Sequence, residues 1–276
     1  VISNPELVAA VSEAGGFGLL ATAFQEEPAA VREQVRATRN LTDKPFGANL
    51  MLMNAMNPRF ADVLAEEGVK IVTLSGGSPK AILPYLHDRG IKALCVVPTV
   101  DIAKKAEDLG VDGIIAEGSE SGGIQGYKGA STFVLVPAVA DAVKVPVIAA
   151  GGIADRRGYR AALALGADGV QVGTRFIATR ECVAHIRYKE AVIGCAETST
   201  RLVNLGRFLV RALNTPAVDK INCGEFGAGD AFCRSAFEES WIRGNLDAAL
   251  LPVGQSAGLV RSIPSAKAVI EEMVSE

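Results

Sequence analysis

Three segments of the chain combine one or more glycines with small or polar residues, and this combination suits the binding of an anion by backbone N–H groups. The segments are Glu117–Gly123, Ile148–Ile153 and Val170–Phe176. Glycine lets the backbone approach a ligand closely, and a helix that starts at such a turn points its positive dipole end at the anion. A single glycine pair also suits a tight turn with no ligand, whereas two motifs on successive strands favour a phosphate-bearing cofactor. The predicted phosphate site consists of Gly151, Gly152, Gly173 and Thr174.

Polar residues in other apolar runs predict contacts to the ring of such a cofactor. Asn49 lies within the run PFGANLML, and a buried amide needs hydrogen-bond partners. The edge of a flavin ring offers both a donor and an acceptor. The turn Ser75-Gly76-Gly77 ends the next apolar run and allows the same close approach. Glu117 has two interpretations: it bonds the hydroxyl groups of a ribityl chain, or it is an inward-facing carboxylate satisfied by the protein.

The elements that must position these residues are short apolar runs alternating with amphipathic stretches, the pattern of consecutive βα units around a parallel sheet. The predicted strands are 16–22, 46–52, 70–74, 93–98, 113–117, 145–150 and 169–172. The predicted helices start with one from Asn4-Pro5-Glu6 to Gly15 and continue at about 28–39, 58–67, 78–89, 100–109, 131–143 and 155–165. Glycines at 68, 90, 110 and 166 follow helix ends, as C-caps require.

This order of elements predicts a (β/α)₈ TIM barrel, although only seven strands are marked where eight are needed. We expect the first strand to be missing from this chain, which begins at Val1 with a helix; an open, doubly wound sheet is the alternative. The rhythm of βα units is lost after Arg180. We therefore predict a barrel domain made of 1–180 and 251–276, with 181–250 forming a small helical lid over the substrate.

The composition excludes several classes of protein. The 276 residues carry a net charge of −3, which gives no basic surface for nucleic acid. The apolar runs are too short to cross a membrane. The five cysteines form no CxxC pair, so neither a zinc site nor a disulfide framework is expected. We expect a cytoplasmic protein without a metal.

The motifs LTDKPFGANLML, GVDGIIAEGSESGG, VPVIAAGGIADRRG, ALGADGVQVGTRF and GQSAGL, in this order, resemble the nitronate monooxygenase / enoyl-ACP reductase II (FabK-type) family. The resemblance covers nearly the whole chain and is weakest across about 214–250. It implies an FMN-binding barrel, often a homodimer, with a small helical insertion after the last strand. The implied FMN contacts are Asn49, Ser75, Gly76, Gly77, Glu117, Gly122, Gly123, Ala150, Gly151, Gly152, Gly173, Thr174, Gln255 and Ser256.

Two details favour the reductase branch of this family. The stretch HIRYKE, beginning at His185, is similar to the HxxYKE segment of FabK-type reductases, and Pro252–Val260 resembles their closing helix. The resemblance then implies that NADH or NADPH reduces FMN. It further implies that the flavin passes hydride to a trans-2-enoyl thioester carried by acyl carrier protein.

The chain departs from the family at its usual acid/base. Most members have a histidine after the paired glycines, whereas this chain has Ile124. Removing a proton from a nitroalkane would lose its base, while reduction of an enoyl group needs only some proton donor. The candidate replacements are Tyr127, Lys128 and His185; His87 is expected on an outer helix. The alternatives are a nitronate monooxygenase of the 2-nitropropane dioxygenase type, an NAD(P)H:quinone reductase, and a flavin-binding protein that has lost catalysis.

Overall fold

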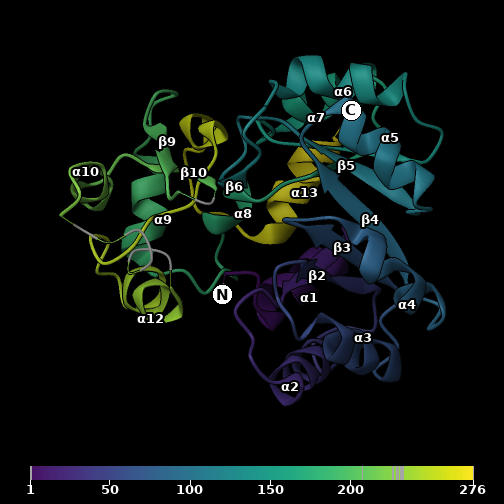
Figure 1. Cartoon of the computed structure of the whole chain (residues 1–276). Helices are drawn as coiled ribbons and strands as arrows, with labels where there is room; N and C mark the ends of the chain where they lie inside the picture. The colour runs from purple at the N-terminus through teal and green to yellow at the C-terminus, as the bar shows by residue number, and fades with distance from the viewer. Residues whose placement is uncertain (1, 207, 226, 228–229, 231–232, 276) are drawn as a thin grey trace.

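The computed structural model describes residues 2–206, 208–225, 227, 230 and 233–275. Over these residues seven parallel strands form one curled sheet in the order β1-β2-β3-β4-β5-β7-β8 (Figure 1). The strands are β1 (Gly18–Ala21), β2 (Phe46–Met51), β3 (Ile71–Ser75), β4 (Lys92–Val97), β5 (Gly113–Glu117), β7 (Val147–Ala150) and β8 (Gly169–Gln171). A doubly wound sheet reverses its order at a switch point, and this sheet does not. The prediction of a TIM-barrel architecture is therefore confirmed.

Helices connect the strands and cover the outside of the sheet. They are α1 (Pro5–Glu13), α2 (Pro28–Arg39), α3 (Asn57–Glu66), η1 (Pro79–Ala81), α4 (Leu83–His87), α5 (Val100–Asp108), α6 (Thr132–Ala140), α7 (Arg156–Ala164), α8 (Thr174–Ile177), η3 (Gln255–Leu259) and α13 (Ala266–Val274). The glycines predicted as C-caps all have positive φ, from 67° at Gly90 to 95° at Gly166. Helix α1 begins as predicted, but the Asn4 side chain makes no cap bond to the backbone and donates to Glu6 instead.

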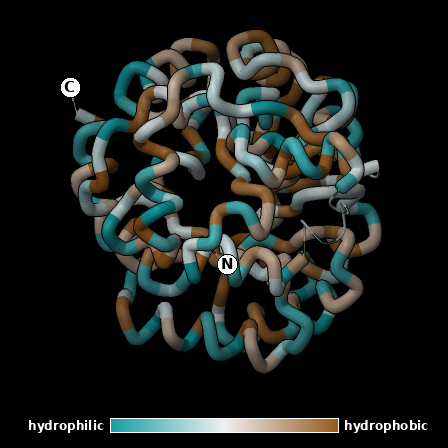
Figure 2. Tube along the Cα trace, turned by 90° about the vertical axis from the view of Figure 1, so that its left-hand side faces the viewer, coloured by the Kyte–Doolittle hydropathy of each residue, from teal (hydrophilic) through white to brown (hydrophobic). Residues whose placement is uncertain are grey.

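The main core lies between the sheet and these helices. Along each strand alternate residues face outward: Ile114 and Ala116 of β5 belong to this core, as do Val147 and Ala149 of β7. Because side chains in a strand alternate between its two faces, the residues between them point into the curled sheet. Figure 2 shows that short hydrophilic and hydrophobic stretches follow one another along the chain. In the part of the chain that the structure describes, no helix combines the length and hydropathy needed to span a membrane.

The described residues between 181 and 250 lie beside the barrel and are called the lid below (Figure 1). Its elements are α9 (Ile186–Ile193), β9 (Thr200–Asn204), β10 (Leu209–Leu213), α10 (Pro216–Asn222), α12 (Arg234–Phe237) and η2 (Glu238–Ile242). The expectation of helices alone was wrong here. Strand β10 pairs antiparallel with β9 and with β6 (Gly123–Gln125), which comes from the loop after β5. Such a short strand is stable only when a distant segment pairs with it, so local sequence does not reveal it.

Aromatic side chains hold the lid together. The rings of Phe237 and Trp241 stack with centroids 4.1 Å apart. Trp241 donates from Nε1 to the carbonyl oxygen of Leu250 at 2.9 Å, and the Tyr188 hydroxyl donates to that of Pro252 at 3.1 Å. Both ring systems are buried. The lid is thereby fixed to the segment that returns to the barrel.

Candidate active site

Strands β2 and β3 present a polar cluster on the inner face of the sheet. The Asn49 amide donates from Nδ2 to Thr73 Oγ1 at 2.9 Å and lies 3.3 Å from Ser75 Oγ. Gly76 follows with φ of 73°, so the chain turns sharply as β3 ends. Asn49 and Ser75 are only partly buried, which leaves both able to meet a ligand. The predicted residues Asn49, Ser75, Gly76 and Gly77 are brought together at this edge.

The end of β5 carries a second polar group on the same inner face. Glu117 Oε1 accepts a hydrogen bond from the Ser121 hydroxyl at 2.7 Å. Burial raises the pKa of Glu117 to about 7, and the Ser121 bond opposes this rise because it favours the carboxylate. Gln125 donates from Nε2 to Ser121 Oγ at 2.7 Å and to the Ser121 carbonyl oxygen at 3.0 Å. Glu117 therefore has protein partners, as one of its two interpretations required.

The glycine-rich turns after β7 and β8 lie side by side, because Ala150 pairs with Gln171 in the sheet. Gly151 and Gly152 have φ of 98° and 74°. A side chain at Gly151 would lie 2.9 Å from the carbonyl oxygen of Gly118, so glycine is required by both conformation and space. At Gly173 an added Cβ meets no atom within 4 Å, so open space borders this backbone. These two turns form a cradle of backbone groups beside an open volume.

The segment after the lid returns to these turns. The Gly254 backbone N–H donates to Thr174 Oγ1 at 2.9 Å, and that of Gln255 donates to the Glu120 carbonyl oxygen at 2.8 Å. Ser256 is buried, and Gly122 packs directly against the Gly254 backbone. The predicted residues around β5, β7, β8 and 254–256 thus meet at one end of the barrel, although they lie far apart in the chain.

The three candidate acid/base residues lie away from this cluster. Tyr127 is 61% exposed, and its hydroxyl donates to the Gly206 carbonyl oxygen of the lid at 3.0 Å. Lys128 is exposed next to it. His185 precedes α9, where Nδ1 accepts from the Arg187 backbone N–H at 3.2 Å, and its ring packs against Gly244. His87 ends α4 and lies 3.0 Å from Asp112 at the surface.

Sequence reasoning missed Ser121 and Gln125, the residues that contact Glu117 directly or through one hydroxyl. The available signal was the density of polar residues in ESESGGIQG. The position directly after the glycines is Ile124, which packs beside Val203 and Val210 in the small core of the lid. In strand β6, neighbouring side chains point to opposite faces, so Gln125 rather than Ile124 points toward Ser121, the partner of Glu117.

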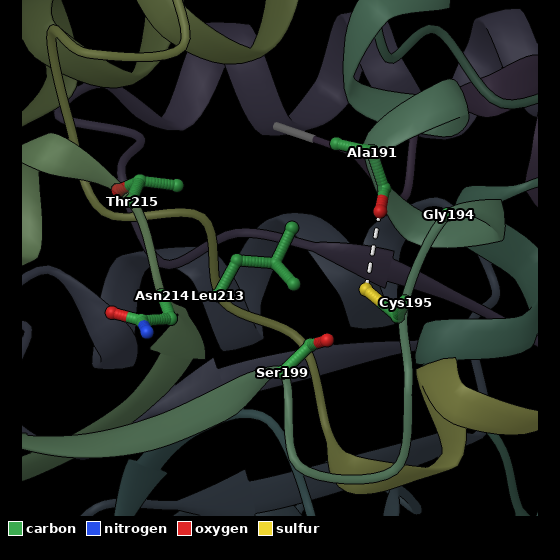
Figure 3. A pocket seen from close by; sticks show the side chains of 7 residues that line it. All are labelled: Ala191, Gly194, Cys195, Ser199, Leu213, Asn214 and Thr215. Carbon is green, nitrogen blue, oxygen red and sulfur yellow. Dashed lines mark hydrogen bonds between the residues drawn. The ribbon is translucent and has the colours of Figure 1, made fainter.

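A separate cavity of about 260 Å³ lies within the lid, lined by Ala191, Gly194, Cys195, Ser199, Leu213, Asn214 and Thr215 (Figure 3). The Cys195 thiol donates to the Ala191 carbonyl oxygen at 3.1 Å, as Figure 3 shows. Burial raises the pKa of this thiol, which disfavours the reactive thiolate. The cavity contains none of the residues predicted to bind the cofactor.

Comparison with known proteins gives the chain both sequence and structural relatives. The family model described as nitronate monooxygenase matches residues 1–62 and 56–276. A nitronate monooxygenase from Pseudomonas aeruginosa is 32% identical over 99% of this chain and 93% of its own length. A 5-hydroxy-7a-methyl-1-oxo-octahydro-1H-indene-4-carboxyl-CoA dehydrogenase from Rhodococcus jostii is 29% identical over 100% and 89%. The solved structure of FabK from Thermotoga maritima has a TM-score of 0.93 and 39% identity, covering 99% of this chain and 88% of that one.

Proposed function

Because the chain belongs to the nitronate monooxygenase family and is therefore an oxidoreductase, we propose that it is an FMN-dependent reductase of 2-enoyl thioesters. NADH or NADPH is the proposed reductant, and an enoyl group on acyl carrier protein or coenzyme A is the proposed acceptor. The 39% identity to FabK supports the reductase assignment. The coenzyme A thioester in the name of the Rhodococcus relative supports the thioester class.

The residues at the strand ends fit an FMN molecule. Gly151, Gly152 and Gly173 form the proposed phosphate cradle, since Gly151 and Gly152 adopt positive φ and the backbone at Gly173 borders open space. Thr174 fixes this cradle to the return segment. Asn49 is the proposed partner of the flavin edge. The other proposed contacts are Ser75, Gly76, Gly77, Glu117, Gly122, Gly123, Ala150, Gln255 and Ser256. When bound, FMN supplies two-electron chemistry: it accepts hydride from the nucleotide and delivers it to the acceptor.

The observation that carries the choice of reaction is the position of Ile124. Its side chain packs against the apolar core of the lid, so the position at which the family resemblance implies an acid/base histidine contributes no imidazole here. Proton removal from a nitroalkane needs a base of suitable pKa within hydrogen-bond reach. Hydride addition to an enoyl thioester needs a proton donor instead, and a buried carboxyl group is suited to that role.

Nitronate oxidation is the second candidate, because the family model and the Pseudomonas relative carry that name. A nitronate is already deprotonated, so its oxidation makes less demand on a base than oxidation of the neutral nitroalkane does. The two reactions differ in what reoxidises the reduced flavin.

The test compares electron acceptors. Purified holoenzyme is reduced anaerobically with NADH or NADPH and then mixed with crotonyl-CoA, or with an alkyl nitronate and oxygen. We expect the nucleotide to bleach the flavin and crotonyl-CoA to restore its absorbance. Turnover with the nitronate alone would replace our proposal by the second candidate. Release of FAD rather than FMN on heating would contradict the cofactor assignment.

A further inference from the structure

Glu117 lies at the proposed active site, in surroundings that favour the neutral form of its carboxyl group over the carboxylate. It ends β5 on the inner face of the sheet, opposite the apolar residues Ile114 and Ala116. It lies beside the turn that carries the proposed cofactor cradle, because Glu117 pairs with Ala150 in the sheet and a Cβ added at Gly151 would lie 3.2 Å from the amide nitrogen of Ser121. Burial disfavours the charged form of a carboxyl group, so its pKa is raised to about 7. At neutral pH a large fraction of this group therefore keeps its proton.

A chain of two hydrogen bonds orients the carboxyl group. Gln125 donates to the Ser121 hydroxyl oxygen, which directs the hydroxyl proton toward Glu117 Oε1. Because Oε1 accepts this bond, the proton of the neutral acid is carried by Oε2. Gln125 and Ser121 are 7% and 9% exposed, so water competes little for either bond.

The pairing of strand β6 places the Gln125 side-chain amide next to Ser121. Gln125 pairs with Leu209 and Ile124 with Val210, so β6 is held as an edge strand of the lid sheet. The alternation along this strand sends Ile124 into the lid core and Gln125 toward Ser121. The lid sheet therefore fixes Gln125, which in turn holds Ser121, the partner of Glu117.

The charged groups on neighbouring elements are engaged elsewhere. Glu120, in the same loop, accepts from the Thr132 backbone N–H at the start of α6, at 2.8 Å. Arg211 of β10 donates from Nε to the Ser119 carbonyl oxygen at 2.9 Å. The negative charge of Glu120 acts on Arg211, where it opposes the lowering of the guanidinium pKa by burial. The pKa of Glu117 is set by burial first and by the Ser121 bond second.

We propose that Glu117 is the proton donor of this site and that Ser121 and Gln125 are its positioning residues. The proposal rests on the proposed enoyl-thioester reduction. In that reaction the C=C π bond breaks, the reduced flavin provides the hydride that forms the new C–H bond at the β-carbon, and the flavin is oxidised. Glu117 Oε2 gives its proton to the α-carbon and is left as a carboxylate. Solvent then returns one proton to it for each turnover.

The first experiment is single-turnover reoxidation of nucleotide-reduced holoenzyme by crotonyl-CoA, with rates normalised to bound FMN. General acids contribute about 10²- to 10⁴-fold, so Glu117→Gln should slow reoxidation at least about 100-fold more than it slows flavin reduction. Glu197→Gln changes an exposed lid carboxylate and should leave both steps unchanged. If the two half-reactions of Glu117→Gln slow by the same factor within about threefold, Glu117 is not the donor.

The second experiment does not depend on turnover. The infrared spectrum of oxidised holoenzyme, wild type minus Glu117→Gln, should contain a protonated carboxyl C=O band that titrates away with a midpoint near pH 7. Ser121→Ala and Gln125→Leu should raise the midpoint, because the bond that favours the carboxylate is lost or misdirected, and Ser121→Thr should restore it. A band absent at pH 5 and above would overturn the inference.

The two experiments distinguish a failure of the proposed role of Glu117 from a failure of the proposed enoyl-thioester reduction. Wild-type enzyme that is not reoxidised by crotonyl-CoA defeats the proposed function, and the infrared titration then decides whether Glu117 holds a proton. Wild-type enzyme that is reoxidised, with Glu117→Gln equally competent, defeats the inference alone.

Discussion

Replacing Glu117 by glutamine should change the pH dependence of stability in a predictable direction. The folded-state pKa is about 7 and the ordinary value is 4.5, so the folded protein favours the neutral form. For a raised pKa, the stabilising contribution is fully present below about pH 4.5 and is lost as pH rises through about 7. Glutamine cannot ionise, so the variant should not suffer this loss.

The size of the effect follows from the two pKa values. The difference between the two pKa values corresponds to about 3.4 kcal/mol at about 1.4 kcal/mol for each pH unit, of which roughly 0.8 kcal/mol is already lost at pH 5. Between pH 5 and pH 8 the wild type should therefore lose about 2.5 kcal/mol relative to Glu117→Gln. In a chain of this size that corresponds to a relative fall in Tm of about 5–10 °C.

The assay is thermal unfolding of both proteins at pH 5, 6, 7 and 8 with saturating FMN. Taking the difference between the proteins removes the titration of every group they share, and Glu197→Gln serves as the exposed control. A difference in stability between wild type and Glu117→Gln that stays within about 0.5 kcal/mol from pH 5 to pH 8 would refute the argument that burial raises this pKa.

Three further outcomes test the site and the lid. Gly173→Asp should fold normally, because a Cβ there meets no atom within 4 Å, but the added carboxylate should repel the phosphate and abolish FMN binding. The neutral Gly173→Asn should retain more FMN, and flavin content after gel filtration measures both. Tyr127→Phe and Lys128→Met should each change crotonyl-CoA reoxidation by less than about threefold, since both side chains are exposed; a loss near 10²-fold would return the proton donor to this loop. Tyr188→Phe should lower the free energy of unfolding by about 1–2 kcal/mol, because the Pro252 carbonyl oxygen loses a buried hydrogen-bond donor. Urea titration measures this, and an unchanged midpoint of unfolding would contradict the Tyr188–Pro252 bond.

Short-range patterns were enough to predict the barrel. Buried parallel strands appear as apolar runs, and the run predicted at 113–117 is β5. The helix ends were visible because a glycine with positive φ, as at Gly68 and Gly110, marks the C-cap. The glycine pair after β7 was likewise recognisable, because Gly151 and Gly152 both have positive φ, which selects glycine.

The tertiary structure alone decided which residue holds Ser121 beside Glu117, and it alone decided the strands of the lid. Strand β6 forms because β10, far along the chain, pairs with it, and that pairing determines which of Ile124 and Gln125 faces the barrel. The family resemblance pointed to position 124, whereas the residue that hydrogen-bonds to Ser121 is Gln125. The local sequence does not show which of these two neighbouring side chains points toward the barrel, because both residue types suit a short strand. Pairing with β10 decides which face of β6 each side chain occupies. The raised pKa of Glu117 has the same origin, since burial is a property of the assembled loops rather than of any single segment.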